Sequence, residues 1–285
     1  MSTRVVPLAE AVATCVQDGA SVALEGFTHL IPFAAGHEII RQGRRDLHLI
    51  RMTPDLIYDQ LIGAGCAARL TFSWGGNPGV GSLHRLRDAV EHQWPRPLAL
   101  SEFTHAQMAV ALEAGASGLP CGLLRAYVAT DLERVPGAAG IRTVTCPFTG
   151  APLSAVQAVN PDVTILHAQQ LDARGNVRLV GIVGAAKEAA FAAKRVLVTV
   201  EEQVESFAAD LNAIVLPAWV VTAASIVPGG AYPSYAQGYY PRDNAFYRAW
   251  DAIARDRATF TAWIERHVLG VRDHAALLRE LGVAA

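Results

Sequence analysis

Short apolar runs that end in polar residues are the feature that most constrains the fold of this chain. The clearest run covers residues 163–166, Val-Thr-Ile-Leu, and polar residues that include His167 and Gln169 follow directly. Such a run is typical of a strand buried inside a parallel sheet. Because open α/β sheets bind ligands beyond the carboxyl ends of their strands, we predict a ligand site that includes His167 and Gln169.

Strand-like and helix-like patterns alternate along the chain. Helical periodicity covers residues 6–16, 33–42 and 108–114, and strands are expected at 21–24, 47–51, 69–73, 98–101, 143–146, 163–167, 196–200 and 213–216. This alternation predicts an α/β fold in which a mostly parallel sheet is flanked by helices. No linker rich in glycine or serine divides the chain, so we expect a single domain over residues 1–285.

Composition excludes several functional classes. Of the 285 residues, 52% are hydrophobic and 18% are charged, which indicates a compact globular protein. The net charge of −2 and the scattered Lys and Arg residues give no basic surface for nucleic acid. The first ten residues lack a signal-peptide pattern, and Gly, Pro or charged residues interrupt every long apolar stretch. We therefore expect a soluble, cytoplasmic protein with no nucleic-acid or membrane partner.

Neither the cysteines nor the histidines have the spacing of a metal site. The cysteines are far apart, without a C-x-x-C pair, at Cys15, Cys66, Cys121 and Cys146, and we expect four buried free thiols. His29, His105 and His167 follow expected strands, but no two of them have the spacing of metal ligands. We expect His167 to form hydrogen bonds within its own loop. No serine lies in a G-x-S-x-G motif, so a self-contained nucleophile is missing.

Two glycine-containing turns follow expected strands and are candidate binding loops. The first turn contains Gly26, Phe27 and Thr28, and the second is the glycine-rich loop, residues 75–81, with Gly76, Asn77, Pro78 and Gly79. Glycine lets backbone N–H groups approach an anionic ligand closely, although an ordinary tight turn is an equal alternative. Neither turn matches the phosphate-binding P-loop or the Rossmann fingerprint, which argues against nucleotide phosphate transfer and against NAD.

Several carboxylates also end expected strands. Glu25 and Glu102 each follow an apolar strand, where a carboxylate can act as a base or a nucleophile, or can cap a helix or join an ion pair. Glu201 and Glu202 follow the strand at 196–200, and there a pair of acids is more often the charge complement of a helix start.

The order and spacing of several segments resemble the α chain of the glutaconate-type class I coenzyme A transferases. The matching segments are 22–28 (Val-Ala-Leu-Glu-Gly-Phe-Thr), 39–43, 61–65, 118–120, 146–148, 160–178 and 228–234. The resemblance extends over nearly the whole chain and implies the NagB/RpiA-like fold of the CoA-transferase superfamily. It also implies that the chain is the α subunit of a heteromeric enzyme that moves coenzyme A between an acyl-CoA thioester and a carboxylic acid.

The same resemblance implies a division of labour between two subunits. The nucleophilic glutamate would lie on the CoA-transferase β subunit, and coenzyme A would enter as a thioester substrate without any further cofactor. Backbone N–H groups of residues 26–28 would help to hold an oxyanion, and residues 72–82 would shape the acyl pocket. Pro78 stands where the family's α chains carry a serine, so the acyl group can differ from glutaconate.

Other members of the family define the alternatives. One relative decarboxylates 3-methylglutaconyl-CoA, and another hydrolyses a steroid-derived CoA thioester with a glutamate on its α chain. In this sequence the corresponding position is near His105, with Glu102 one helical turn earlier, so these two residues are the candidate catalytic base. A third alternative is a non-catalytic, ligand-sensing protein of related fold, against which the lack of a helix-turn-helix pattern before Ser21 argues.

Overall fold

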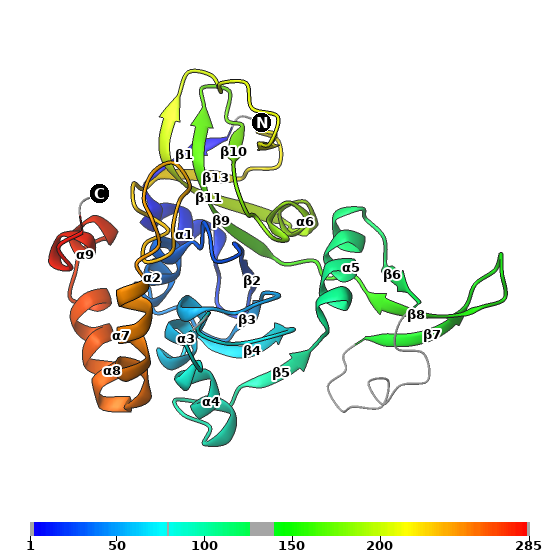
Figure 1. The fold of residues 1–285 in the computed structure, drawn as a ribbon, viewed down its shortest axis with the longest axis horizontal. Coiled ribbons are helices and arrows are strands. Elements are labelled where there is room, and N and C mark those ends of the chain that lie inside the picture. The colour runs from blue at the N-terminus through cyan, green and yellow to red at the C-terminus, as the bar shows by residue number, and fades with distance from the viewer. Residues whose placement is uncertain (1–2, 79, 126–139, 284–285) are drawn as a thin grey trace.

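A large mixed sheet forms the centre of the molecule (Figure 1). The computed structural model describes residues 3–78, 80–125 and 140–283. Within these ranges ten strands form the sheet: β1 (Arg4–Val5), β2 (Ser21–Leu24), β3 (Leu47–Ile50), β4 (Ala67–Phe72), β5 (Ala99–Glu102), β9 (Val163–Asp172), β10 (Val177–Leu179), β11 (Arg195–Val204), β12 (Ile214–Leu216) and β13 (Ala223–Ile226). The main path runs β1-β13-β11-β9-β2-β3-β4-β5, and neighbours on it are parallel.

The strand order reverses between β2 and β9. From β2 the chain adds β3, β4 and β5 on one side, and it later adds β9, β11 and β13 on the other. At the junction Val22 pairs with Val163 and Leu24 pairs with Ile165. Such a switch point opens a crevice beyond the carboxyl ends of the strands, so the residues that follow Leu24 and Ile165 are well placed to bind a ligand.

Helices cover both faces of this sheet (Figure 1). They are α1 (Leu8–Cys15), α2 (Phe33–Arg41), α3 (Leu56–Gly63), α4 (His84–Glu91), α5 (His105–Ala116), α6 (Ala186–Ala192), α7 (Asn244–Arg255), α8 (Arg257–Ile264) and α9 (His274–Glu280), with a π-helical turn, η2 (Glu265–Leu269), after α8. Alternation along β2 divides the core: Val22 and Leu24 pack with residues of α1 to α4, α7 and α8, whereas Ala23 packs with Met108 of α5.

A second, antiparallel sheet lies beside α5, at the right of Figure 1. It consists of β6 (Cys121–Leu124), β8 (Pro152–Gln157) and β7 (Ile141–Thr145), in the order β6-β8-β7. The expected strand at 143–146 belongs to this sheet, not to the parallel one. Ile141 is the one buried residue of β7, and a strand so exposed cannot occupy the interior of a parallel sheet.

The remaining expected strands lie in the main sheet, with two differences. The strand expected at 213–216 is β12, which pairs antiparallel with β10 and not with the parallel path. β9 and β11 each continue for several residues beyond the expected ends at 167 and 200, and they stay paired from Arg195 opposite Val163 to Val204 opposite Asp172. Because β9 and β11 remain paired along this extension, both strands continue through the polar residues that follow positions 167 and 200.

Two further expectations concern cysteine and the membrane. Cys15 and Cys66 are buried, but Cys121 and Cys146 are half-exposed, so the expectation of four buried thiols is wrong for the latter two; all four are free. Cys121 and Cys146 lie at the small sheet, where fewer core residues cover them. In the part of the chain that the structure describes, no helix is long and apolar enough to cross a membrane.

Candidate active site

The turn after β2 has a backbone conformation that only glycine can start. Gly26 has a φ of 152°, and a Cβ atom there would lie 2.7 Å from the carbonyl oxygen of His29 and 2.8 Å from that of Leu30. The N–H of Phe27 donates to the His29 carbonyl at 3.1 Å. Thr28 and Leu30 have positive φ values of 55° and 53°, which is uncommon for residues with side chains. Such strain is typical of functional turns and requires support from neighbouring groups.

Side chains from two other loops supply that support. Arg51, which follows β3, donates from Nη2 to the Gly26 carbonyl oxygen at 2.7 Å, and Ser234 donates from Oγ to the Thr28 carbonyl oxygen at 2.9 Å. These carbonyl groups are thereby turned toward the protein. The peptide group that carries the Thr28 N–H lies between these two fixed carbonyl groups, whereas the Phe27 N–H already donates within the turn.

His29 joins the same turn to two further loops. Its Nε2 accepts a hydrogen bond from the Gln237 N–H at 3.0 Å, so Nδ1 carries the proton and donates to the Ile182 carbonyl oxygen at 3.0 Å. Burial lowers the pKa of His29, which keeps the ring neutral. His29 is therefore a positioning residue that joins the loops after β2, β10 and β13.

Glu25 and Arg51 are buried near each other at the base of the turn, with no hydrogen bond between their described atoms. Only 3% of Glu25 is exposed, and burial raises its pKa to about 7 although the nearby charge of Arg51 lowers it. Glu25 Oε1 and the Nε and Nη1 groups of Arg51 have no hydrogen-bond partner among the described residues. A carboxyl group with a pKa near neutral at a strand end is a common feature of functional sites.

The glycine-rich loop, which follows β4, packs against α7. Gly76 and Asn77 are buried and Pro78 is half-buried, whereas Gly79 lies outside the described residues. Asn77 donates from Nδ2 to the carbonyl oxygen of Tyr247 at 2.8 Å, and its Oδ1 has no partner among the described residues. The loop is therefore tethered to a helix that is distant in sequence.

Arg242 supplies a second tether. Its Nη2 donates to the Pro78 carbonyl oxygen at 3.0 Å, and its guanidinium lies over the ring of Tyr247, 3.8 Å from the centroid. The Tyr247 hydroxyl in turn donates to Asp55 at 3.4 Å, and Asp55 interacts electrostatically with both Arg51 and Arg242. One buried polar network thus connects the loop after β2 with the glycine-rich loop.

His167 and Glu201 form a buried pair on neighbouring strands. The His167 ring bonds through Nδ1 to Thr199 Oγ1 at 2.8 Å and through Nε2 to Glu201 Oε1 at 2.6 Å. Glu201 also accepts from the Tyr240 hydroxyl and, at 2.7 Å, from the Gly229 N–H. Burial alone would raise the pKa of Glu201, but the bonds from His167, Tyr240 and Gly229 outweigh it, so the pKa is lowered.

Two expectations about this pair are wrong. His167 bonds across to β11 and not within its own loop, and Glu201 lies inside β11 instead of starting a helix. In both cases the cause is the extension of β9 and β11, which places His167 directly opposite Thr199. Gln169, farther along β9, is buried and bonds to both backbone groups of Val180, at 2.9 and 3.0 Å, so it secures the loop after β10.

Glu102 and His105 lie at the edge of the sheet that β5 forms. Glu102 is the last residue of β5, the edge strand, and His105 is the first residue of α5; both are exposed. The helix is capped by Thr104 and Gln107, which bond to each other's backbone N–H groups, so neither candidate residue is needed as a cap. β3 and β4 separate β5 from the turn after β2.

A hollow of about 530 Å³ opens beside the turn after β2. Phe27 and Met52 line it together with Ile182, and the carboxylates of Glu113 and Glu188 are at its border. The lining is mostly apolar, which suits a neutral part of a ligand. Glu113 and Glu188 add two acidic side chains to this lining, which disfavours an anionic group beside them.

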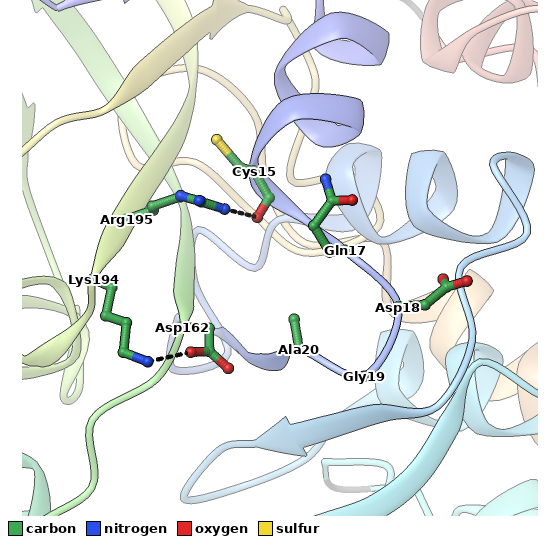
Figure 2. A pocket seen from close by; sticks show the side chains of 8 residues that line it. All are labelled: Cys15, Gln17, Asp18, Gly19, Ala20, Asp162, Lys194 and Arg195. Atoms are coloured by element: carbon green, nitrogen blue, oxygen red, sulfur yellow. Dashed lines mark hydrogen bonds and ion pairs between the residues drawn. The ribbon is translucent and has the colours of Figure 1, made fainter.

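Another hollow, of about 420 Å³, lies at the amino ends of the strands (Figure 2). Lys194 is paired with Asp162 at 2.8 Å, and Arg195 bonds to the Cys15 carbonyl oxygen at 3.3 Å. The lining residues precede or begin β2, β9 and β11, so this hollow lies at the amino ends of these strands. The turn after β2 lies at their carboxyl ends. Its charged side chains are already partnered, and it is not the site described above.

The comparison with protein families decides the identity of the fold. The family model "Coenzyme A transferase" matches residues 5–225. The chain belongs to the coenzyme A transferase family. This CoA-transferase chain is 63% identical over 266 residues to the corresponding subunit of the 3-oxoadipate CoA-transferase of Pseudomonas knackmussii, a match that covers 93% of this chain and 94% of the relative.

Two solved structures extend the comparison. Glutaconate CoA-transferase of Acidaminococcus fermentans superposes with a TM-score of 0.90, at 29% identity, over 98% of this chain and 93% of that one. A variant of the decarboxylase AibA/AibB gives a TM-score of 0.79 at 33% identity, over 93% of this chain and 100% of that one. The expected α/β CoA-transferase fold and the expected assignment as the α chain of a heteromeric CoA-transferase are confirmed.

Sequence reasoning missed several residues of this CoA-transferase site. Arg51 ends a strand that was correctly expected, so a search for charged residues at strand ends would have found it. Arg242 and Tyr240 lie in a loop without any motif, and no local pattern points to them. The structure unites Gly26, Phe27 and Thr28 with the glycine-rich loop. Within the described parts of the chain Glu102 and His105 do not bond to these residues, but α5, which begins at His105, lines the hollow beside Phe27 through Ala109 and Glu113, so their role stays a prediction.

Proposed function

We propose that this chain, as the α subunit, works with a β subunit to move coenzyme A between a dicarboxylic acyl-CoA and a second carboxylic acid. The observation that carries the proposal is the 63% identity, over nearly the full length of both chains, to a subunit of a 3-oxoadipate CoA-transferase. The favoured acyl group is therefore a 3-oxo dicarboxylic acid of the 3-oxoadipate type. The half-buried Pro78, where glutaconate-type chains carry a serine, accords with a substrate other than glutaconate.

In the proposed reaction a glutamate from the β subunit first attacks the acyl-CoA carbonyl and expels the thiolate of coenzyme A, which leaves an acyl-glutamyl anhydride. The thiolate then attacks the glutamyl carbonyl, releasing the first acid and forming an enzyme thioester. A second carboxylate attacks that thioester, and the displaced thiolate takes the new acyl group and frees the glutamate. Covalent catalysis thus divides one difficult exchange into easier steps. Coenzyme A is a substrate here, and the steps use no other cofactor.

In this proposal the role of the α subunit is to position and stabilise. Each tetrahedral intermediate carries negative charge on an oxygen atom, and among residues 26–28 we assign its stabilisation to the backbone N–H of Thr28, because the N–H of Phe27 already donates to His29 and that of Gly26 bonds to Glu25. Arg51 and Ser234 hold the carbonyl groups of this turn, so the donor is oriented before the reaction begins. Loss of one such donor typically costs about 10²–10³-fold in kcat. The free cysteines accord with the proposed location in a reducing cytoplasm.

The test is to express the chain alone, its partner alone and both together. We expect CoA transfer only with both subunits, because the site on this chain holds no self-contained nucleophile. Incubation with acyl-CoA followed by borohydride or hydroxylamine should modify one glutamate of the β subunit, which mass spectrometry of the separated subunits would reveal. Modification of Glu25 or Glu102 on this chain would contradict the proposal.

A second candidate function is hydrolysis or decarboxylation of a CoA thioester, and the similarity to a decarboxylase gives it weight. In that case Glu102 or His105 acts as a general base, and Glu102→Gln or His105→Ala should reduce turnover by roughly 10²–10⁴-fold. In the transferase both variants should stay within several-fold of wild type, because both side chains are exposed at the sheet edge. Release of coenzyme A with and without an acceptor acid distinguishes the two: turnover without any acceptor, abolished by either substitution, would favour the alternative.

A further inference from the structure

Unpartnered polar groups gather around Tyr247, between the two loops of the site. They are Nε and Nη1 of Arg51, Oδ1 of Asn77 and Nε of Arg242, and none has a hydrogen-bond partner among the described residues. Asn77 and Arg242 both contact Tyr247 directly. Buried polar groups are nearly always hydrogen-bonded, and leaving one unpaired is costly. Arg51 and Asn77 are fully buried, whereas Arg242 is half-exposed and lines a hollow, so Arg242 is the one of the three that a polar ligand can reach.

The charge of this cluster favours an anion. Arg51 and Arg242 each carry a permanent positive charge, and the acids close to them are Asp55 and Glu25. Burial raises the pKa of both acids, to about 7 for Glu25, so the folded protein disfavours their charged forms. Among the described residues neither guanidinium forms an ion pair with a carboxylate; Arg51 and Arg242 donate to the carbonyl oxygens of Gly26 and Pro78 instead, so their charges are incompletely neutralised. An anionic group of a ligand would neutralise the remaining positive charge.

Arg242 also lines a hollow of about 330 Å³ between the loop after β13 and α9. Apolar groups such as Leu278 line it together with Tyr232. Asp243 lines it too, and its Oδ1 accepts from the Phe246 N–H at 2.9 Å while its Oδ2 accepts from the Tyr232 hydroxyl at 2.6 Å. Arg242 thus offers positive charge to a space that can hold an aliphatic chain.

The two hollows near the loops of the site differ in charge. The hollow beside Phe27 has Glu113 and Glu188 at its border, which repel an anion. Arg242 contacts the glycine-rich loop through the Pro78 carbonyl oxygen, so a ligand held by Arg242 lies next to the expected acyl pocket. Charge therefore assigns the anionic end of a substrate to the side of Arg242.

We propose that Arg242 binds the distal carboxylate of a dicarboxylic acyl group and so determines the preference for dicarboxylic over monocarboxylic substrates. The inference rests on the proposed CoA-transferase function and deepens it. Arg51, which is only 1% exposed and bonds to Gly26, is a positioning residue, and like Arg242 it acts electrostatically on Asp55. A guanidinium suits the task because it presents parallel N–H donors to a carboxylate.

The test compares two donors of equal chain length, adipyl-CoA and hexanoyl-CoA, with the assembled two-subunit enzyme and one common acceptor acid. Arg242→Gln should reduce the ratio of kcat/KM for adipyl-CoA to that for hexanoyl-CoA by about 10- to 100-fold, the worth of one charge-assisted hydrogen bond. The loss should lie mainly in KM. Arg242→Lys should retain part of the preference, and added guanidinium should partly restore it in Arg242→Ala.

Arg248, an exposed arginine of α7, provides the matched control, and Arg248→Gln should leave the ratio unchanged. Equal losses with both donors in Arg242→Gln would mean that Arg242 only holds the glycine-rich loop, and an unchanged ratio would mean that the carboxylate binds elsewhere; either result overturns the inference. A wild-type complex that transfers coenzyme A from neither of these donors nor from 3-oxoadipyl-CoA would instead contradict the proposed function.

Discussion

Glu25 is the residue whose chemistry depends most on its surroundings. It directly follows β2, has one carboxylate oxygen without a partner among the described residues, and is close to Arg51 and Glu188. Its pKa, about 7 instead of the ordinary 4.5, is raised mainly by burial. The folded protein therefore holds the Glu25 proton more tightly than the unfolded chain does. Stability that this proton supplies at acidic pH is lost as the pH rises from 4.5 to about 7.

Glu25→Gln should remove that dependence, because glutamine mimics the protonated side chain at every pH. Relative to wild type, the variant should gain roughly 1–3 kcal/mol in the free energy of unfolding between pH 5 and pH 8. Urea unfolding of both proteins at several pH values measures this gain. Glu205→Gln, at an exposed carboxylate, is the control and should show no such trend. A difference between Glu25→Gln and wild type that does not vary with pH would contradict the prediction.

The elements that shape the candidate site are the turns that follow β2 and β4, together with the extended strands β9 and β11. The turn after β2 requires glycine at its first position, since a Cβ on Gly26 would meet the backbone of His29, Leu30 and Ile31 at 2.7–3.0 Å. Backbone atoms cannot move aside as a flexible side chain can. The strain at Thr28 is likewise maintained only while neighbouring loops hold the turn.

Gly26→Ala should therefore destabilise the protein by at least ~2 kcal/mol and abolish transfer, since the turn cannot keep its shape. Gly43→Ala is the matched comparison: Gly43 has a φ of 63°, but no atom lies within 4 Å of its added Cβ. That substitution should cost only ~1 kcal/mol, the penalty for a left-handed backbone. Denaturant unfolding of both variants gives the two values. Equal costs would mean that the close contacts at Gly26 do not matter.

At the scale of the whole molecule, segments distant in sequence share one core. Trp250 and Phe260, near the C-terminus, are buried in the same cluster as Phe33 and Leu61. Trp250 also donates from its ring N–H to Asp59 at 3.2 Å. The C-terminal helices are thus part of the cluster that covers one face of the sheet, and they should not unfold on their own.

We predict that the chain unfolds in one cooperative transition, as expected for the single domain over residues 1–285. Calorimetry should give equal calorimetric and van't Hoff enthalpies. Trp250→Ala should lower the stability of this entire transition, by about 3–5 kcal/mol. Two separate transitions, or a loss confined to the C-terminal helices in hydrogen exchange, would contradict a single domain.

Local patterns were sufficient to determine much of this protein. Apolar runs and glycine punctuation correctly predicted β2 and β3 and most of the parallel sheet, and they identified the turn at Gly26. These features depend on neighbouring residues only. The resemblance of ordered segments also predicted the family, which the family model confirmed.

Only the tertiary structure decided which of these residues meet. His167 and Glu201 face each other because β9 and β11 continue side by side, and Arg242 reaches Pro78 across 164 positions of sequence. Likewise, β7 lies in a separate sheet although its sequence resembles that of a strand in the main one. Strand order and the packing of distant loops produce such contacts, and no periodicity within one segment records them. The polar network of the site is therefore a property of the folded chain.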